Sequence, residues 1–164
     1  MKFNLNSFLI GVSVALDMAE KNIFNVSTYH SRRVAYIAVR IAKKLGMSKE
    51  ECFDICSLAI LHDNGLTESA LIYDRDPVSS MIDLEHVFEH CQIGENNVKN
   101  YPFLTSVANV ILYHHENYDG TGFYGKVGTD IPIMSRIISF SDVIDCNVSL
   151  IDSSLSKKNK IISN

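Results

Sequence analysis

Apolar residues recur every three or four positions in six segments of the chain, which is the spacing of one face of an α-helix. The segments cover residues 7–25, 27–45, 48–63, 84–98, 107–113 and 132–143. No stretch of the sequence shows a convincing alternation of apolar and polar residues, the pattern of a half-buried β-strand. The pattern therefore predicts an all-α bundle.

Residues with a known preference for helix ends mark some of these boundaries. Ser48 and Glu51 have the spacing of a capping box, and Gly46 is well placed to end the helix before it. Residues 64–82 mix glycine, proline, serine and aspartate, so we expect a connection there with one short helical turn around residues 68–73.

The remaining segments lack a clear helical spacing of apolar residues. Residues 117–128 contain four glycines and predict a structured loop, which lacks the lysine and hydroxyl ending of a phosphate-binding P-loop. A chain of 164 residues suits one domain. We therefore expect this domain to cover residues 1–150, followed over residues 151–164 by a short polar tail or a truncated helix.

Composition excludes several classes of function. The net charge is -4 and the basic residues are scattered among acids, so duplex nucleic acid is not an expected partner. No apolar run approaches the roughly 18 residues of a membrane span, and a soluble, cytoplasmic protein is expected. The four cysteines lack a Cys-x-x-Cys pair and are expected to be reduced and mostly buried.

Polar side chains with metal-ligand chemistry lie on the apolar sides of five predicted helices. These residues are His30, His62, Asp63, His90, His114, His115 and Asp142. A small core cannot leave so many polar groups unpaired, so we expect them to converge on metal. His86 is set apart as a surface or supporting histidine.

Seven nitrogen and oxygen donors are too many for one tetrahedral ion, but they suit two ions that share the carboxylate of Asp63. Such a pair would activate a bridging hydroxide for in-line attack on a phosphoester, with His62 and Asp63 at the catalytic centre. The histidine-rich set favours iron or manganese, with zinc as an alternative, over calcium and magnesium.

The order of these residues resembles the HD-GYP branch of the HD phosphohydrolase superfamily. The motifs are His30-Ser31-x-Arg33-Val34-Ala35, Leu61-His62-Asp63-x-Gly65, His90-x-x-x-Gly94, His114-His115-Glu116-x-x-Asp119-Gly120-x-Gly122 and Ile131-Pro132-x-x-x-Arg136-Ile137-Ile138-x-x-x-Asp142-Val143. The resemblance implies an HD-domain bundle of about six or seven helices around a binuclear metal site. It also implies hydrolysis of a cyclic dinucleotide, with cyclic di-GMP as the first candidate.

The resemblance assigns the ligands to two ions. The first would be held by His30, His62, Asp63 and Asp142, and the second by Asp63, His90, His114 and His115. A variant of the family with a third metal has a glutamate where this chain has Val26, so two metals are expected.

The chain departs from the family in its phosphate contact, its signature loop and its short C-terminal part. Leu66 stands where the family has a lysine, and Lys126 is a weak candidate to replace it. The signature loop consists of Asp119, Gly120, Gly122, Phe123 and Tyr124, with Phe-Tyr in place of Tyr-Pro. Two alternatives stay open: a weakly active or inactive metal-containing binding module, and a hydrolase of another nucleotide or phosphoester. A homodimer or a signalling protein partner is also compatible with the sequence.

Overall fold

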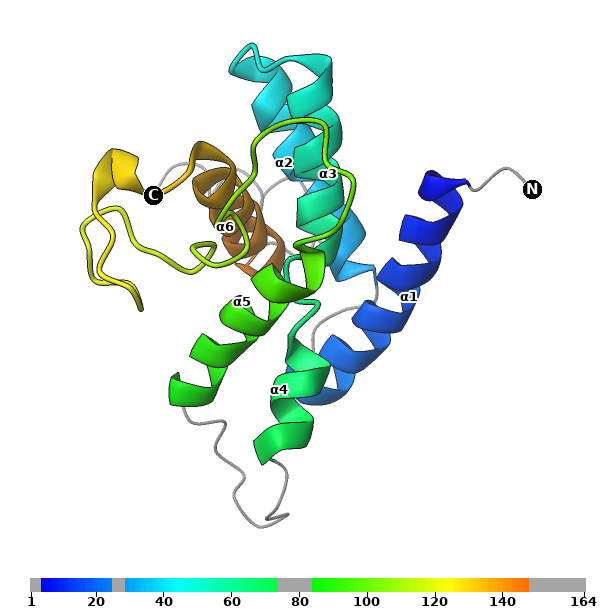
Figure 1. Cartoon of the computed structure of the whole chain (residues 1–164), viewed down its shortest axis with the longest axis vertical. Helices are drawn as coiled ribbons and strands as arrows, with labels where there is room; N and C mark the ends of the chain where they lie inside the picture. The colour runs from blue at the N-terminus through cyan, green and yellow to red at the C-terminus, as the bar shows by residue number, and fades with distance from the viewer. Residues whose placement is uncertain (1–3, 25–28, 74–83, 148–164) are drawn as a thin grey trace, which may run out of the picture.

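The computed structural model describes residues 4–24, 29–73 and 84–147, and the named elements within these ranges are all helices, as the sequence predicts (Figure 1). The elements are α1 (Leu5–Phe24), α2 (His30–Lys44), α3 (Lys49–Leu61), α4 (Leu66–Tyr73), α5 (Leu84–Val98), the short 3-10 helix η1 (Gly128–Asp130) and α6 (Ile133–Asn147). Over the described ranges, no helix is long and apolar enough to cross a membrane.

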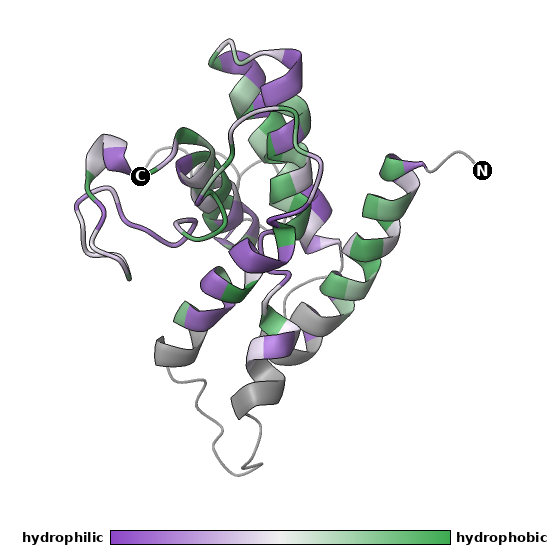
Figure 2. Cartoon of the chain, viewed as in Figure 1, coloured by the Kyte–Doolittle hydropathy of each residue, from purple (hydrophilic) through white to green (hydrophobic). Residues whose placement is uncertain are grey.

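The helices pack around a core formed mainly by α2, α3 and α6. The α2 helix lies against both α3 and α6, α4 lies beside α5, and α1 contacts α2, α3 and α4 (Figure 1). Val34, Ile55 and Ile138 come from the three central helices and are fully buried. Figure 2 shows α1 and α3 as largely hydrophobic ribbons. Burial of these apolar faces stabilises the bundle.

The predicted end of α2 and the predicted start of α3 are confirmed. The Ser48 hydroxyl accepts a hydrogen bond from the backbone N–H of Glu51, whose carboxylate accepts one from the N–H of Ser48. Gly46 follows the end of α2 with φ of 76°, a left-handed conformation that favours glycine. The start of α2 differs, because it begins at His30 after Tyr29, and the preceding residues 25–28 lie outside the described ranges.

The prediction of a helix over residues 107–113 is wrong, because this segment forms a series of turns. The carboxylate of Glu95, on α5, accepts hydrogen bonds from the backbone N–H groups of Asn109, Ile111 and Leu112 at 2.6, 3.1 and 3.1 Å. Asn109 also has a φ of 63°, which a continuous right-handed helix cannot include. A tertiary contact therefore replaces helical hydrogen bonding at the point where the chain reaches His114.

Two other boundaries differ from expectation. The short turn expected around residues 68–73 is a helix of eight residues, α4, and the connection beyond it, residues 74–83, lies outside the described ranges. The last helix continues past residue 143 to Asn147, and the predicted tail over residues 151–164 also lies outside them.

All four cysteines are free, as expected, but the expectation of general burial was too broad. Cys91 is buried, Cys52 and Cys56 are partly buried, and Cys146 is exposed.

A close approach of two backbones sets α5 against the turn that follows α3. A Cβ atom built on Gly65 would collide with the carbonyl oxygen of His90 and would lie 2.8 Å from the backbone nitrogen of Gly94. Only a residue without a side chain fits between these backbones. The contact places Asp63, two residues before Gly65, beside His90.

Candidate metal centre

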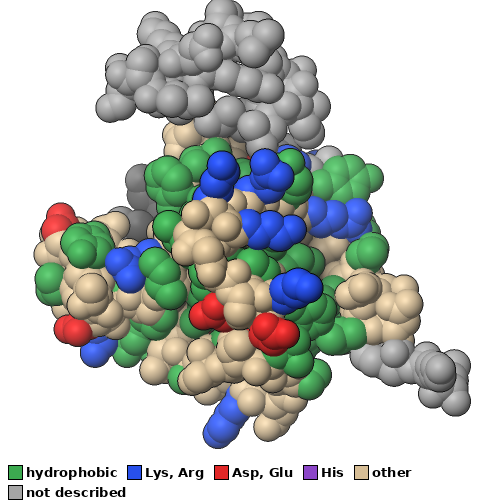
Figure 3. All heavy atoms as spheres, turned by 90° about the horizontal axis from the view of Figure 1, so that it is seen from above, with side chains coloured by type: hydrophobic (Ala, Val, Ile, Leu, Met, Phe, Trp, Pro, Cys, Tyr) green, Lys and Arg blue, Asp and Glu red, His purple; other side chains and the backbone are tan. Residues whose placement is uncertain are grey.

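The structure brings together the seven residues predicted as ligands, in a chain of short contacts from His30 to His115. His30 begins α2, His62 and Asp63 follow α3, His90 lies on α5, His114 and His115 follow the turn segment, and Asp142 lies on α6. Among the described residues, no histidine is visible on the face shown in Figure 3, where lysine and arginine side chains surround hydrophobic ones. The histidines face the interior: His30, His62, His90 and His114 are buried.

Asp63 lies at the middle of this group. Its Oδ2 is 3.1 Å from Nε2 of His62, and its Oδ1 is 3.2 Å from Nε2 of His90 and 3.5 Å from Nε2 of His114. At the other end, Nε2 of His30 is 3.2 Å from Oδ1 of Asp142. The rings of His30 and His62 have centroids 5.6 Å apart, which links the two ends.

Backbone carbonyl groups orient two of the imidazole rings. Nδ1 of His62 lies 2.9 Å from the carbonyl oxygen of Ala59, and Nδ1 of His114 lies 2.6 Å from that of Ile111. An Nδ1–H that donates to a carbonyl leaves Nε2 as the atom that binds metal, with its lone pair directed into the site once any proton on it is displaced. Both Nε2 atoms face Asp63 in this arrangement.

The ring of His30 is oriented by a carboxylate that the sequence analysis missed. Nδ1 of His30 lies 2.7 Å from Oδ2 of Asp145, and the guanidinium of Arg33 donates hydrogen bonds to both carboxylate oxygens of Asp145. Burial would raise the pKa of Asp145, but the hydrogen bonds from His30 and Arg33 outweigh it and lower this pKa. The available signal was spacing, because Asp145 follows Asp142 and Arg33 follows His30 by three residues, within one helical turn.

The donor set fits cations because two atoms at its centre are buried without a hydrogen-bond partner. These atoms are Nε2 of His62 and Oδ1 of Asp63. Nε2 of His62 lies 3.1 Å from Oδ2 of Asp63, and Oδ1 of Asp63 lies 3.2 and 3.5 Å from Nε2 of His90 and of His114. These contacts lack hydrogen-bond geometry. Unpaired buried polar atoms are costly, and a divalent ion among them would satisfy both.

Protonation states in the protein without metal follow from the same contacts. Burial would lower the pKa of His62, but the neighbouring carboxylate of Asp63 raises it to about 9. Burial lowers the pKa values of His114 and His115, so both rings are neutral at pH 7 and able to bind metal. Burial would raise the pKa of Asp142, but the hydrogen bond from His30 outweighs it, and this pKa falls to about 2.

The signature loop is folded around Glu116, another residue whose role the sequence analysis did not predict. The buried carboxylate of Glu116 accepts hydrogen bonds from the backbone N–H groups of Tyr124 at 2.7 Å and Lys126 at 2.6 Å. A Cβ atom on Gly122 would lie 2.6 Å from Oε1 of Glu116. Gly122 therefore lets the loop close on this carboxylate, directly after His115.

The other signature residues shape the loop or extend from it. Asp119 accepts hydrogen bonds from the backbone and hydroxyl groups of Thr121, and Gly120 has a φ of 84°. The ring of Phe123 lies 6.1 Å from that of His115 between centroids, and 38% of the Phe123 side chain is exposed. Phe123 thus presents an aromatic surface next to the histidines.

The two positions considered for a phosphate contact offer no cation at the centre. Leu66 begins α4 and is buried. The ammonium group of Lys126 lies over the ring of Tyr113, 5.4 Å from its centroid. The side chain of His86, which was set apart from the ligands, lies outside the described part of the structure.

The fold and the site define an all-α bundle with a candidate binuclear metal centre. A match to the family described as HD domain extends over residues 14–158, and the chain therefore belongs to the HD-domain family.

Curated relatives with this domain are considerably longer than the present chain. It is 30% identical over 148 residues to a cyclic di-GMP phosphodiesterase of Thermotoga maritima, a match that covers 87% of this chain and 40% of the relative. It is 35% identical over 124 residues to the cyclic di-GMP phosphodiesterase response regulator RpfG of Xanthomonas campestris, covering 71% of this chain and 32% of the relative.

A solved structure has the same fold. It is described as a cyclic GMP-AMP specific phosphodiesterase of Vibrio cholerae, V-cGAP3, and it superposes with a TM-score of 0.71 at 22% identity. The superposition covers 96% of this chain and 44% of the Vibrio protein. This likeness supports the helical architecture described above.

Proposed function

We propose that this chain is a metal-dependent phosphodiesterase of the HD-GYP branch, and that it hydrolyses a cyclic dinucleotide, with cyclic di-GMP as the first candidate. The observation that carries the proposal is the gathering of seven donor residues with Asp63 at their centre, where Oδ1 of Asp63 and Nε2 of His62 are buried without hydrogen-bond partners. The relatives named as cyclic di-GMP phosphodiesterases support this substrate class. A 29% identical relative from Vibrio cholerae is named a 3'3'-cGAMP-specific phosphodiesterase, so this dinucleotide is the second candidate.

The proposed ligands form two groups that share Asp63. The first consists of His30, His62, Asp63 and Asp142, and the second of Asp63, His90, His114 and His115. When bound, divalent iron, manganese or zinc would supply an activated water at neutral pH and positive charge against the phosphate.

The residues of the chain then have three tasks. Ala59 and Ile111 hold two imidazole rings through their carbonyl oxygens, and Asp145 holds His30, so that the ligands keep their positions without metal. The burial of His62, His90 and His114 keeps bulk water away from their ring nitrogens. Phe123 offers an exposed ring beside His115 against which a nucleobase can stack.

A second candidate function is a metal-containing binding module with weak or no hydrolysis. The observation in its favour is Leu66, a buried apolar side chain at the position of the family lysine. Loss of one electrostatic contact to a transition state typically costs a factor of about 100 to 1,000 in rate. The intact donor set therefore favours slow hydrolysis over complete inactivity. The expected cytoplasmic location and the homodimer or signalling partner stay predictions.

The test is product formation by metal-loaded protein. Cyclic di-GMP, 3'3'-cGAMP and a generic aryl phosphodiester are incubated with wild-type protein, and products are separated by chromatography. We expect a linear dinucleotide or mononucleotide from a cyclic dinucleotide, and none with chelator or with Asp63→Asn. Turnover of the aryl compound alone would identify another phosphodiester as substrate. Bound metal without turnover in either wild type or Leu66→Lys would support the binding module.

A further inference from the structure

The carboxylate of Glu95, on α5, holds the turn segment formed by residues 107–113. Its Oε1 accepts a hydrogen bond from the backbone N–H of Asn109 at 2.6 Å. Its Oε2 accepts two more, from the N–H groups of Ile111 and Leu112, each at 3.1 Å. The Glu95 side chain is partly exposed, whereas Ile111 is fully buried. One side chain at the edge of α5 therefore fixes the path of the turn segment at three points.

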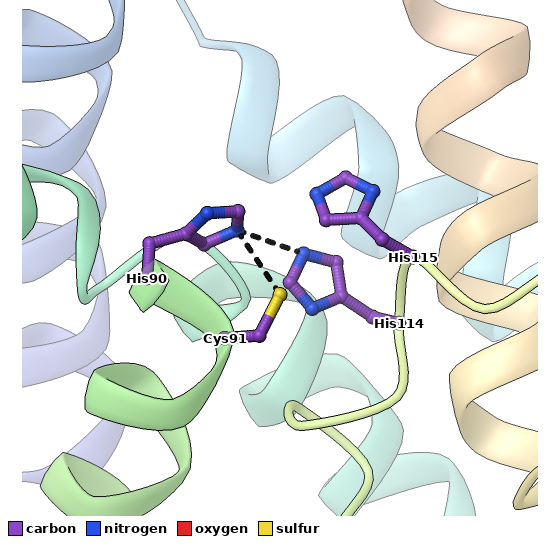
Figure 4. A group of neighbouring side chains, drawn as sticks. All are labelled: His90, Cys91, His114 and His115. Carbon is purple, nitrogen blue, oxygen red and sulfur yellow. Dashed lines mark hydrogen bonds between the residues drawn. The ribbon is translucent and has the colours of Figure 1, made fainter. Parts of the chain in front are cut away.

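The peptide group between Ile111 and Leu112 is hydrogen-bonded at both ends. Its N–H, which belongs to Leu112, donates to Oε2 of Glu95. Its carbonyl oxygen, which belongs to Ile111, accepts a hydrogen bond from Nδ1 of His114 at 2.6 Å. Figure 4 shows the opposite side of this ring, where Nε2 of His114 faces Nε2 of His90 at 3.4 Å. A continuous line of contacts thus leads from the Glu95 carboxylate, through one peptide group and one imidazole ring, to a metal-binding nitrogen.

Hydrogen bonds in such a line polarise one another. A carboxylate that accepts the N–H of a peptide group leaves the carbonyl oxygen of the same group more negative. A more negative oxygen holds the Nδ1–H of the imidazole more firmly and makes the opposite nitrogen a stronger donor to metal. Ile111 and His114 are fully buried, so solvent does not compete for the contact between the carbonyl and the ring.

The neighbouring peptide group, between Val110 and Ile111, is held by the same carboxylate but does not lead to a ligand. Its N–H donates to Oε2 of Glu95. Its carbonyl oxygen accepts a hydrogen bond from the buried hydroxyl of Ser135, on α6, at 2.8 Å. Ser135 therefore fastens the turn segment to α6 without taking part in the line of contacts to His114. The two peptide groups separate a purely structural anchor from a contact that reaches the metal centre.

We propose that Glu95 is a positioning residue of the metal centre, and that its carboxylate, acting through the peptide group between Ile111 and Leu112, orients His114 and strengthens its Nε2 as a metal ligand. This inference rests on the metal centre of the proposed function and adds to it a residue outside the seven donors. Loss of an outer partner of a metal-bound histidine typically weakens metal binding about 10- to 100-fold. The ion affected is the one that His114 would hold.

The first test is NMR of the full chain without metal, with isotope-labelled histidine. The Nδ1–H groups of His114 and His62 both donate to carbonyl groups, so each should give a downfield proton resonance, and His114→Asn identifies the first. We expect Glu95→Gln to move the His114 resonance upfield, because a neutral amide polarises the peptide group less, and to leave the His62 resonance in place.

Ser135→Ala is the matched control, because it loosens the same turn segment and leaves the line from Glu95 to His114 intact. It should lower the urea midpoint and leave both resonances in place. An unchanged His114 resonance in Glu95→Gln, or an equal movement of it in Ser135→Ala, would overturn the role of Glu95.

The second test measures metal affinity in competition with a chelating dye. Glu95→Gln should weaken the binding of one ion about 10- to 100-fold, whereas Ser135→Ala should bind metal as wild type does. Equal affinities in Glu95→Gln and wild type would overturn this inference and leave the proposed function standing. Wild-type protein that binds no divalent metal would contradict the proposed function, and the NMR comparison would still decide whether Glu95 acts on His114.

Hydrogen exchange of wild-type protein without metal keeps the inference testable if Glu95→Gln does not fold. The backbone N–H of Leu112 and the Nδ1–H of His114 should both exchange slowly, because they are bonded through the same peptide group. Exchange of the Leu112 N–H at the rate of an unprotected amide would show that Glu95 does not hold this peptide group, and it would overturn the inference.

Discussion

Substitution of Gly65 by alanine tests whether the approach of two backbones positions the metal centre. The added Cβ would collide with the carbonyl oxygen of His90 and would lie 2.8 Å from the backbone nitrogen of Gly94. Both neighbours are backbone atoms, so no side chain can rotate away. An ordinary contact of about 3.5 Å requires the turn and α5 to separate by roughly 1 Å.

The expected cost follows from overpacking. Extra methyl groups in a well-packed core typically cost about 1 to 3 kcal/mol, and a clash with backbone belongs at the upper end, so we expect about 3 kcal/mol. Gly11→Ala is the matched control, because a Cβ on Gly11, within α1, meets nothing within 4 Å. In a helix interior this change is expected to stabilise by about 0.5 to 1 kcal/mol.

The assay is urea unfolding of both variants, with chelator present, followed by metal titration. Gly65→Ala should lower the urea midpoint and Gly11→Ala should raise it, with similar slopes. Separation of the backbones also moves Asp63 from His90, whose facing atoms are 3.2 Å apart, so metal affinity should fall in Gly65→Ala alone. An unchanged urea midpoint for Gly65→Ala would refute the packing argument.

Three further changes have expected outcomes. Asp54→Ala removes a fully buried carboxylate that accepts hydrogen bonds from the backbone of Leu104 and Thr105, and it should cost about 3 kcal/mol in urea unfolding without reducing metal content. Asp145→Asn disturbs the orientation of His30 and should weaken metal binding about 10- to 100-fold in competition with a chelating dye. Because Asp63 raises the pKa of His62 to about 9 in metal-free protein, the folded state holds a proton that the unfolded state releases above about pH 6.5. The urea midpoint with chelator should therefore fall as the pH rises from about 6.5 through 9, whereas metal affinity should rise over the same range; a flat midpoint would contradict the contact between His62 and Asp63.

The sequence predicted most helices because their apolar periodicity is long and their ends carry local signals. Ser48 and Glu51 cap α3 through contacts within four residues, which a sequence pattern can contain. The predicted helix over residues 107–113 does not form, because the carboxylate of Glu95, more than ten residues earlier, accepts hydrogen bonds from N–H groups that a helix would use. Such a contact exists only after α5 and the turn segment have packed together.

The candidate site likewise combines features that local sequence patterns predict with contacts that only the folded chain creates. Seven donors on apolar faces could be predicted, because a buried polar group in an amphipathic pattern requires a partner. The supporting role of Asp145 depends on His30, which is distant in the sequence, and that of Glu116 depends on how the loop that follows it folds back.

The number of metal ions per chain tests the central claim most directly. Elemental analysis of purified, metal-loaded wild-type protein should find about two divalent transition-metal ions per chain. The same analysis of Asp63→Asn, which keeps the size of the side chain and removes its charge, should find one or fewer. Less than one ion per wild-type chain, or an unchanged content in Asp63→Asn, would contradict a binuclear centre that shares Asp63.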